Sequence, residues 1–403
     1  MKTIYSHSYL LLILVAFVFQ SCQKDNHDPE PDETSKEFTY LRVLVSDVNS
    51  NTLSLLKPAS GEMEGFSAKF PKSALYTTES GRLAGIVHRE NNLTETFDIG
   101  LEFHGDHIGT VGTPKFGALL GESALPTHFK SKYGQILTFN DGDGTLSVAQ
   151  ESDVHTSGAK FSTIQAGLLV HHGAMALFSN GNYAVTVKDN SISGVLPERV
   201  KIINSAGQTI HESTLAVQGI HGNASDGTYA VFGSASGVFV VEQDGTQRLI
   251  EYPSSFETAW FGTILETSIA GKFIGYTAAK GAYLIDVTAN TLTPIIENTD
   301  IMQCKTSYDL SKLGVLLHSG VFKWYDLATL SLQNEGSILA ATAKDASQKP
   351  QLVLSQRFAY ITLPTSGELL QVRLQDLASQ SKHSMGGTPY QITLLGYESS
   401  VGH

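Results

Sequence analysis

Four short segments between residues 104 and 221 carry side chains that can bind a metal ion. They are His104-Gly105-Asp106-His107, Pro126-Thr127-His128, His171-His172-Gly173 and Ile220-His221-Gly222. Imidazole nitrogen and carboxylate oxygen are common ligands of Zn²⁺, which proteins usually hold in a tetrahedral site. The candidate ligands are His104, Asp106, His107, His128, His172 and His221. Because six candidates exceed four places, either two ions bind or some of these side chains orient the others.

A repeated strand pair supplies the elements that must position these residues. Each unit joins two apolar, β-branched runs through a Gly, Asp or Asn turn, and the eight units begin at Leu41, Arg82, Gln135, Tyr183, Tyr229, Phe273, Leu313 and Phe358. Their spacing of about 40 to 54 residues is typical of one four-stranded propeller blade per unit and does not suit a βαβ fold or a helical solenoid. No stretch after Leu41 has a helical period, so helix should be scarce. We predict an all-β propeller with eight blades, or seven if one unit is irregular.

The two ends of the propeller indicate how the ring closes. Residues 386–395 form a further strand pattern after the last hairpin, with no partner strand of their own. We expect this strand to complete the first blade, because pairing the two chain ends removes the open sheet edges that promote aggregation.

The predicted blades bring the histidines together. The first strand of a blade lines the central channel, and His128, His172 and His221 precede the hairpins of three consecutive blades by similar intervals. Successive strand residues face opposite sides, and we place His172 rather than His171 inward because His172-Gly173 matches His221-Gly222. We expect the His104–His107 segment, which leaves the second blade, to cover the same opening as a lid.

The sequence does not indicate an enzyme. It contains no HExxH, GxSxG, P-loop or post-strand GxGxxG motif. The Asp141–Gly144 segment reads as a hairpin turn rather than a calcium loop. Two other functions stay open: a metal-dependent hydrolase such as a lactonase, with Asp106, Glu102 or Glu122 as the base, and a metal-free interaction scaffold at the cell surface, in which the histidines are structural.

The N-terminus predicts export. Lys2, an apolar run from Tyr9 to Phe19 and then Cys22 form a lipoprotein signal, since the run is too short to span a membrane. We assign residues 1–21 to the signal peptide, Cys22 to lipidation, 22–37 to a disordered tether and 38–403 to the propeller; a plain secretory signal is the alternative. The protein is then an outer-membrane lipoprotein of the bacterial envelope, facing the periplasm or the cell surface. Cys304 is the one cysteine left, which excludes an intramolecular disulfide.

The charge balance restricts the partners. The chain has 27 Lys and Arg against 39 Asp and Glu, a net charge of −12. Nucleic acid is therefore not expected as a partner, because its phosphates require clustered basic residues. An acidic surface is compatible with collecting cations.

The ordered motifs HGDH, PTHF, FNDGDGT, HHGA and IHGNAS, set among hairpin repeats from Leu41 to Phe239, resemble those of the AztD-type zinc metallochaperones. The resemblance implies a periplasmic propeller that binds Zn²⁺ at the six candidate residues and delivers it to the solute-binding protein of a zinc ABC transporter. This chain departs from that family in its lipid anchor and in lacking a long histidine-rich tail. An outer-membrane receptor is therefore an alternative partner.

Overall fold

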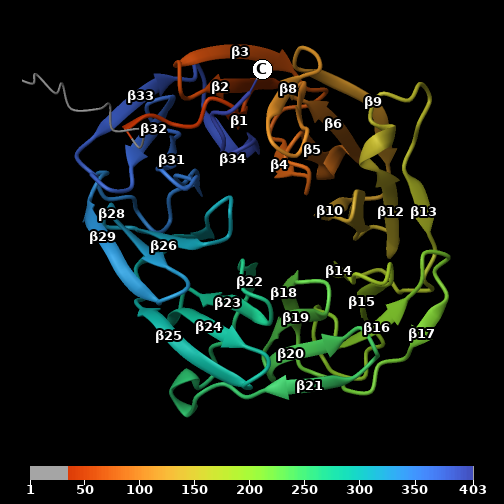
Figure 1. Ribbon diagram of the computed structural model, residues 1–403. Coiled ribbons are helices and arrows are strands. Elements are labelled where there is room, and N and C mark those ends of the chain that lie inside the picture. The colour runs from red at the N-terminus through yellow and green to blue at the C-terminus, as the bar shows by residue number, and fades with distance from the viewer. Residues whose placement is uncertain (1–34, 403) are drawn as a thin grey trace, which may run out of the picture. The chain divides into compact units, whose positions relative to one another are not determined.

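Residues 35–402 are described by the computed structural model, and they form a ring of eight four-stranded antiparallel blades (Figure 1). The all-β propeller prediction is confirmed, with eight blades rather than seven. Helix in this part of the chain is confined to short 3-10 turns such as Arg89–Asn91, Glu151–Asp153 and Ser254–Phe256. None of its helices is long and apolar enough to cross a membrane.

The four strand layers of the blades follow the predicted order. The innermost strands are β34 (Pro389–Gly396), β4 (Ala74–Thr77), β10 (Pro126–Lys132), β14 (Met175–Leu177), β18 (Ile220–Ser225), β22 (Thr263–Glu266), β26 (Ile301–Thr306) and β30 (Leu352–Leu354). The second strands are β1 (Leu41–Asp47), β5 (Leu83–His88), β11 (Gln135–Asn140), β15 (Tyr183–Val187), β19 (Tyr229–Ser234), β23 (Lys272–Thr277), β27 (Lys312–Leu317) and β31 (Phe358–Leu363).

The two outer layers complete each blade. The third strands are β2 (Thr52–Lys57), β6 (Leu93–Asp98), β12 (Thr145–Gln150), β16 (Arg199–Ile203), β20 (Gly237–Glu242), β24 (Gly281–Asp286), β28 (Val321–Asp326) and β32 (Glu368–Arg373). The outermost strands are β3 (Glu62–Ser67), β9 (Lys115–Glu122), β13 (Ser162–Ile164), β17 (Thr209–His211), β21 (Gln247–Ile250), β25 (Thr291–Glu297), β29 (Ser331–Ser337) and β33 (Gln380–Ser384). A separate hairpin of β7 (Leu101–Phe103) and β8 (Ile108–Thr110) interrupts the second blade.

The eight hairpins seen in the sequence are the middle strands of the blades. Neighbouring blades cover both faces of these middle strands, so the sequence of each strand is a nearly continuous apolar run rather than a strict alternation of apolar and polar residues. In β20 the first five residues are buried, whereas the outer strand β29 is mostly exposed. The hydrophobic core is accordingly a series of clusters between adjacent blades. One of them packs Phe139 of the third blade with Tyr183 of the fourth.

The ring closes as the sequence predicts. Strand β34 pairs antiparallel with β1, from Leu41 opposite Gly396 to Asp47 opposite Pro389. Leu394 is buried against the eighth blade and Leu395 against the second. The last strand thus bonds to the first blade and packs on both neighbours of that blade.

The innermost strands give the channel two distinct mouths. Thr77, Lys132, Glu266 and Thr306 are the last residues of four of these strands, and they line one cavity together. We call this end the carboxyl mouth. The opposite end, where the innermost strands begin, is the amino mouth.

The predicted signal peptide, Cys22 and residues 22–34 of the tether lie outside the described residues. Lys36 and Glu37, which the sequence places in the tether, join the propeller instead. The buried carboxylate of Glu37 accepts hydrogen bonds from Ser355 Oγ at 2.5 Å and from the Tyr360 hydroxyl at 2.6 Å. The propeller therefore begins slightly before residue 38.

Candidate metal centre

Three of the six candidate ligands meet at the amino mouth. His128 lies near the start of β10, His172 just before β14 and His221 near the start of β18. The ring centre of His128 is 4.9 Å from that of His172 and 6.4 Å from that of His221, and the last two are 5.3 Å apart. We call these residues the three-histidine cluster.

The spacing of the cluster can be compared with a zinc site. Three imidazoles at about 2.0 Å from one tetrahedral ion have ring centres about 5 Å apart. Two of the measured separations match this value and the third is longer. In this conformation no group of three or more His, Cys, Asp or Glu among residues 35–402 is arranged to hold a metal ion. The rings are therefore neighbours that must still turn before they can converge on an ion.

The proton positions on two of the rings follow from their acceptors. His172 Nδ1 lies 2.7 Å from Asp141 Oδ2, and His221 Nδ1 lies 2.8 Å from the Gly262 carbonyl oxygen. A carboxylate and a carbonyl only accept hydrogen bonds, so each Nδ1 carries the proton. In the neutral form of either ring, Nε2 is then the nitrogen with the lone pair for a metal ion, and such a hydrogen bond at Nδ1 is what orients histidine ligands in metal sites.

The surroundings of His128 favour its neutral form. Burial, followed by the nearby His172 and Lys130, lowers the pKa of His128 to about 4. A metal ion binds the neutral imidazole, because a protonated ring has no lone pair to donate. His128 therefore stays in the ligand form at neutral pH without losing a proton.

Local backbone features aim these histidines. The ladder between β10 and β11 shifts between Pro126 and His128, and that between β18 and β19 shifts between His221 and Asn223. Such bulges commonly redirect side chains beside functional sites. Gly222 has φ of +73°, and a Cβ there would lie 2.5 Å from the Gly262 carbonyl oxygen. Glycine is thus required after His221.

Asp141 belongs to this site, although the sequence analysis treats it as a turn residue. It is buried directly after β11, and its Oδ2 accepts hydrogen bonds from His172 Nδ1 and, at 3.3 Å, from Arg89 Nη2. Burial raises its pKa, but the hydrogen bonds from His172, Thr127 and Arg89 outweigh burial and leave the pKa below the ordinary value. The local sequence around an aspartate that orients a histidine can be the same as that around an aspartate that only shapes a turn, so the sequence does not distinguish the two.

Replacing Asp141 with asparagine should weaken Zn²⁺ binding by about 10- to 100-fold, because removing the partner that orients a histidine ligand typically has that effect. Competition with a chromophoric chelator at neutral pH measures the change. Asp143→Asn is the matched control, since Asp143 lies in the same turn but its carboxylate accepts only from Thr145. Equal affinities of the two variants would contradict a role for Asp141.

The predicted lid is wrong, because the His104–His107 segment lies at the other mouth. It forms the turn between β7 and β8, and the preceding residues Glu102 and Phe103 line the cavity at the carboxyl mouth. The reason is strand direction. The third strand of a blade runs parallel to the innermost one, so the hairpin that follows β6 emerges where innermost strands end.

The β7–β8 turn brings its own potential ligands together. The ring centres of His104 and His107 are 5.2 Å apart, and Asp106 Oδ1 accepts a 2.6 Å hydrogen bond from His107 Nδ1. The Asp106 side chain is 89% exposed. Gly109 makes room for the His104 ring, since a Cβ there would lie 2.7 Å from His104 Nε2. The six candidates are thus divided into two groups of three at opposite mouths.

The propeller is similar to solved structures with the same architecture. A crystal structure of Citrobacter koseri AztD matches with a TM-score of 0.81 and 18% identity over 90% of this chain and 100% of that one. This chain has an AztD-like fold. Apo AztD from Citrobacter koseri matches with a TM-score of 0.80 and 18% identity, over 89% of this chain and 99% of that one. The dihydro-heme d1 dehydrogenase NirN, in complex with DHE, matches with a TM-score of 0.59 and 12% identity, over 89% of this chain and 75% of that one. No protein-family model matches.

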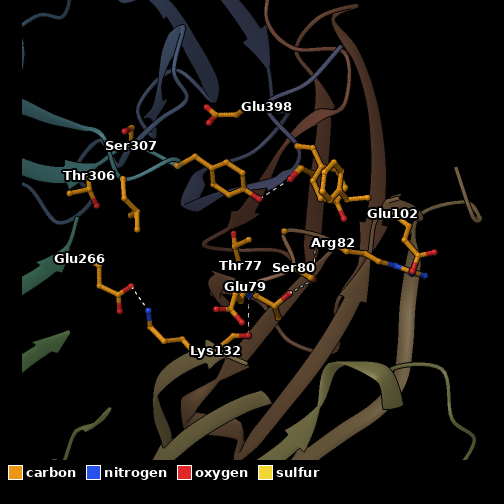
Figure 2. A pocket seen from close by; sticks show the side chains of 18 residues that line it. Thr77, Glu79, Ser80, Arg82, Glu102, Lys132, Glu266, Thr306, Ser307 and Glu398 are labelled. Carbon is orange, nitrogen blue, oxygen red and sulfur yellow. Dashed lines mark hydrogen bonds and ion pairs between the residues drawn. The ribbon is translucent and has the colours of Figure 1, made fainter. Parts of the chain in front are cut away.

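The carboxyl mouth of this AztD-like propeller is a cavity of about 920 Å³ whose lining includes several charged side chains (Figure 2). Lys132 and Glu266 form an ion pair of 2.9 Å across it, and Arg82 lies 3.5 Å from Glu102. Glu398 also lines this cavity (Figure 2). Burial, together with Asp309 and Glu37, raises the pKa of Glu398 to about 7, although the backbone N–H of Gln356 donates to it at 2.5 Å.

This raised pKa predicts a pH-dependent stability. The folded state holds the Glu398 proton more tightly than the unfolded state, so the free energy of unfolding should fall as the pH rises from about 4.5 through about 7. Glu398→Gln should remove this part of the pH dependence and raise the melting temperature at pH 8. Thermal melts at pH 5 and pH 8 test it, with Glu64→Gln on the outer strand β3 as control. A variant that gains nothing at pH 8 would contradict the prediction.

His171 and Cys304 have structural roles. His171 is buried and bonds to the Leu169 carbonyl at 2.6 Å and to Thr186 Oγ1 at 3.0 Å. Cys304 is buried among apolar side chains, and this burial raises its pKa to about 12. Both ring nitrogens of His171 are thus engaged, and Cys304 stays a thiol.

Proposed function

We propose that this protein is an exported metallochaperone that holds Zn²⁺ at the amino mouth through the three-histidine cluster and passes it to a partner protein. The observation that carries the proposal is the meeting of three imidazoles from consecutive blades, two of them with Nδ1 held and Nε2 left for metal. The motif resemblance to the AztD-type family and the shared fold support zinc as the ion. The His104–His107 turn is a second, weaker site, because it offers two imidazoles on an exposed hairpin.

The amino mouth is open enough for transfer. The His172 side chain is 36% exposed. A groove of about 690 Å³ is lined by His221 together with Leu196 and Trp260. An incoming partner can thus reach the bound ion directly. We propose the solute-binding protein of a zinc ABC transporter as that partner, or an outer-membrane receptor if Cys22 anchors the protein at the cell surface.

A transfer assay tests this function. Protein loaded with one equivalent of Zn²⁺ is mixed with a metal-free solute-binding protein or receptor, and acceptor loading is compared with loss of zinc to a small chelator of similar affinity. Direct transfer predicts that the acceptor is loaded faster than zinc dissociates to the chelator. Equal rates would show only release into solution. If the protein binds no zinc at all, the metal-free interaction scaffold becomes the remaining proposal.

The hydrolase alternative lacks a positioned base. Glu102 and Asp106 lie at or beside the carboxyl mouth, and Glu122 ends the outer strand β9. Asp141, beside the cluster, is already held by His172 and Arg89. We therefore propose a non-enzymatic role. Zinc-dependent turnover of lactone or ester substrates that disappears in a His128→Ala variant would contradict it.

A further inference from the structure

The interior of the channel contains a cavity that the zinc function does not use. Its volume is about 520 Å³, and it lies among the innermost strands β4, β10, β26, β30 and β34. Polar side chains in its wall include Gln351, Gln391 and Thr393. Thr77 and Ser131 line both this cavity and the carboxyl mouth, so a solute can enter from that side.

Two lysines face this cavity from opposite sides of the ring. Lys130 lies on β10 of the third blade and Lys305 on β26 of the seventh, four blades apart in a ring of eight. Each is followed directly by a residue of the carboxyl mouth, Ser131 or Thr306, so the two lysines lie at a similar depth.

The cavity wall offers these lysines no negative charge. Its lining, all within residues 35–402, contains neither Asp nor Glu. Lys130 Nζ donates to the Asn223 carbonyl oxygen at 2.9 Å, and no carboxylate in the described part of the chain forms an ion pair with Lys305. Lys132, at the mouth, does have such a partner in Glu266 at 2.9 Å. The lining of this cavity therefore carries two positive charges and no acid, and the carboxylate that acts on Lys130, Glu266, lies at the carboxyl mouth instead.

Two lysines that line one cavity without an acidic residue destabilise the folded state unless an anion binds there. Lys305 is an exposed residue that lines this cavity, and the protein atoms around it lower its pKa through burial. Burying an ammonium group destabilises a protein unless an opposite charge compensates it. The chain has 39 acidic residues, yet none is placed in this cavity wall. An anion from solution would supply the missing charge.

We propose that the channel cavity is a binding site for a small oxyanion or carboxylate, held between the ammonium groups of Lys130 and Lys305. The side-chain amide of Gln391 adds a hydrogen-bond donor, and charge-assisted hydrogen bonds such as those from the two lysines are the stronger kind. The site shares no residue with the three-histidine cluster, so the proposal does not rest on the zinc function.

Binding of defined anions to the zinc-free protein tests the site. Phosphate and citrate are titrated separately by calorimetry, at constant ionic strength set with chloride. At least one should bind with Kd below about 1 mM. Lys305→Gln should weaken that binding at least about tenfold, because it removes a charged hydrogen-bond donor. Lys382→Gln on the outer strand β33 removes the same charge from the surface and should leave binding unchanged.

The outcomes distinguish the ligand and the site. Binding of phosphate alone identifies an inorganic oxyanion, and binding of citrate alone identifies a carboxylate ligand. The melting temperature of Lys305→Gln without added anion should equal or exceed that of the wild type, and its zinc affinity should be unchanged. Failure of both anions to bind below about 1 mM, or equal affinity in Lys305→Gln and the wild type, would overturn the proposal.

Discussion

His128→Ala is expected to weaken Zn²⁺ binding by more than about 100-fold, because removing only an orienting partner already costs 10- to 100-fold. His128 neighbours both other rings of the cluster, at 4.9 and 6.4 Å between ring centres. It is also held neutral, with a pKa of about 4. Its loss leaves two imidazoles that cannot complete a tight tetrahedral site. Competition titration at neutral pH gives the affinity.

Two further variants give this result its meaning. His211→Ala removes a histidine from β17, the outermost strand of its blade and the one farthest from the channel, and should leave the zinc affinity unchanged. The double variant His104→Ala/His107→Ala should remove the weaker binding event and retain the tight one. If instead the double variant loses the tight event and His128→Ala keeps it, the principal site lies on the β7–β8 turn.

Deleting residues 386–403 is expected to abolish the folded state. Strand β34 supplies the innermost strand of the first blade, and its loss opens the ring and exposes a sheet edge on β1. Expression should then give insoluble protein or a chain without a cooperative thermal transition. A soluble truncated protein with a melting temperature near that of the wild type would show that closure is not required.

A point substitution in β34 tests the packing of this strand without removing it. Leu395→Ala should lower the free energy of unfolding by about 2–5 kcal/mol, the usual cost of emptying a fully buried leucine site. Its side chain has no exposed surface and packs against the second blade. Leu332→Ala, whose side chain is 43% exposed on β29, should change the free energy by less than about 0.5 kcal/mol. Chemical denaturation compares the two.

The fold was predictable because a propeller is a local repeat. Each hairpin is defined by neighbouring residues, as in β19 and β20 between Tyr229 and Glu242, and eight such signals set the blade count. The closing strand was predictable because it lacked a hairpin. The β7–β8 hairpin was missed as an element, since its strands have only three residues each.

The candidate site was predictable only in part. His128, His172 and His221 could be brought together because consecutive innermost strands converge on one axis. The position of the His104–His107 turn depends on the direction in which β6 leaves the blade, and no residue in the turn itself indicates that direction. Asp141 was missed because its partner His172 belongs to the next blade.

The sequence by itself determined the repeat, its closure and the three histidines of consecutive blades, because these depend on local patterns and on the symmetry of a ring. Only the tertiary structure decided which residues share a mouth, which carboxylate holds His172 and that Lys130 and Lys305 face one cavity. Those relations join blades that are distant in the chain. They are set by strand direction and by packing across the channel, which no local pattern records.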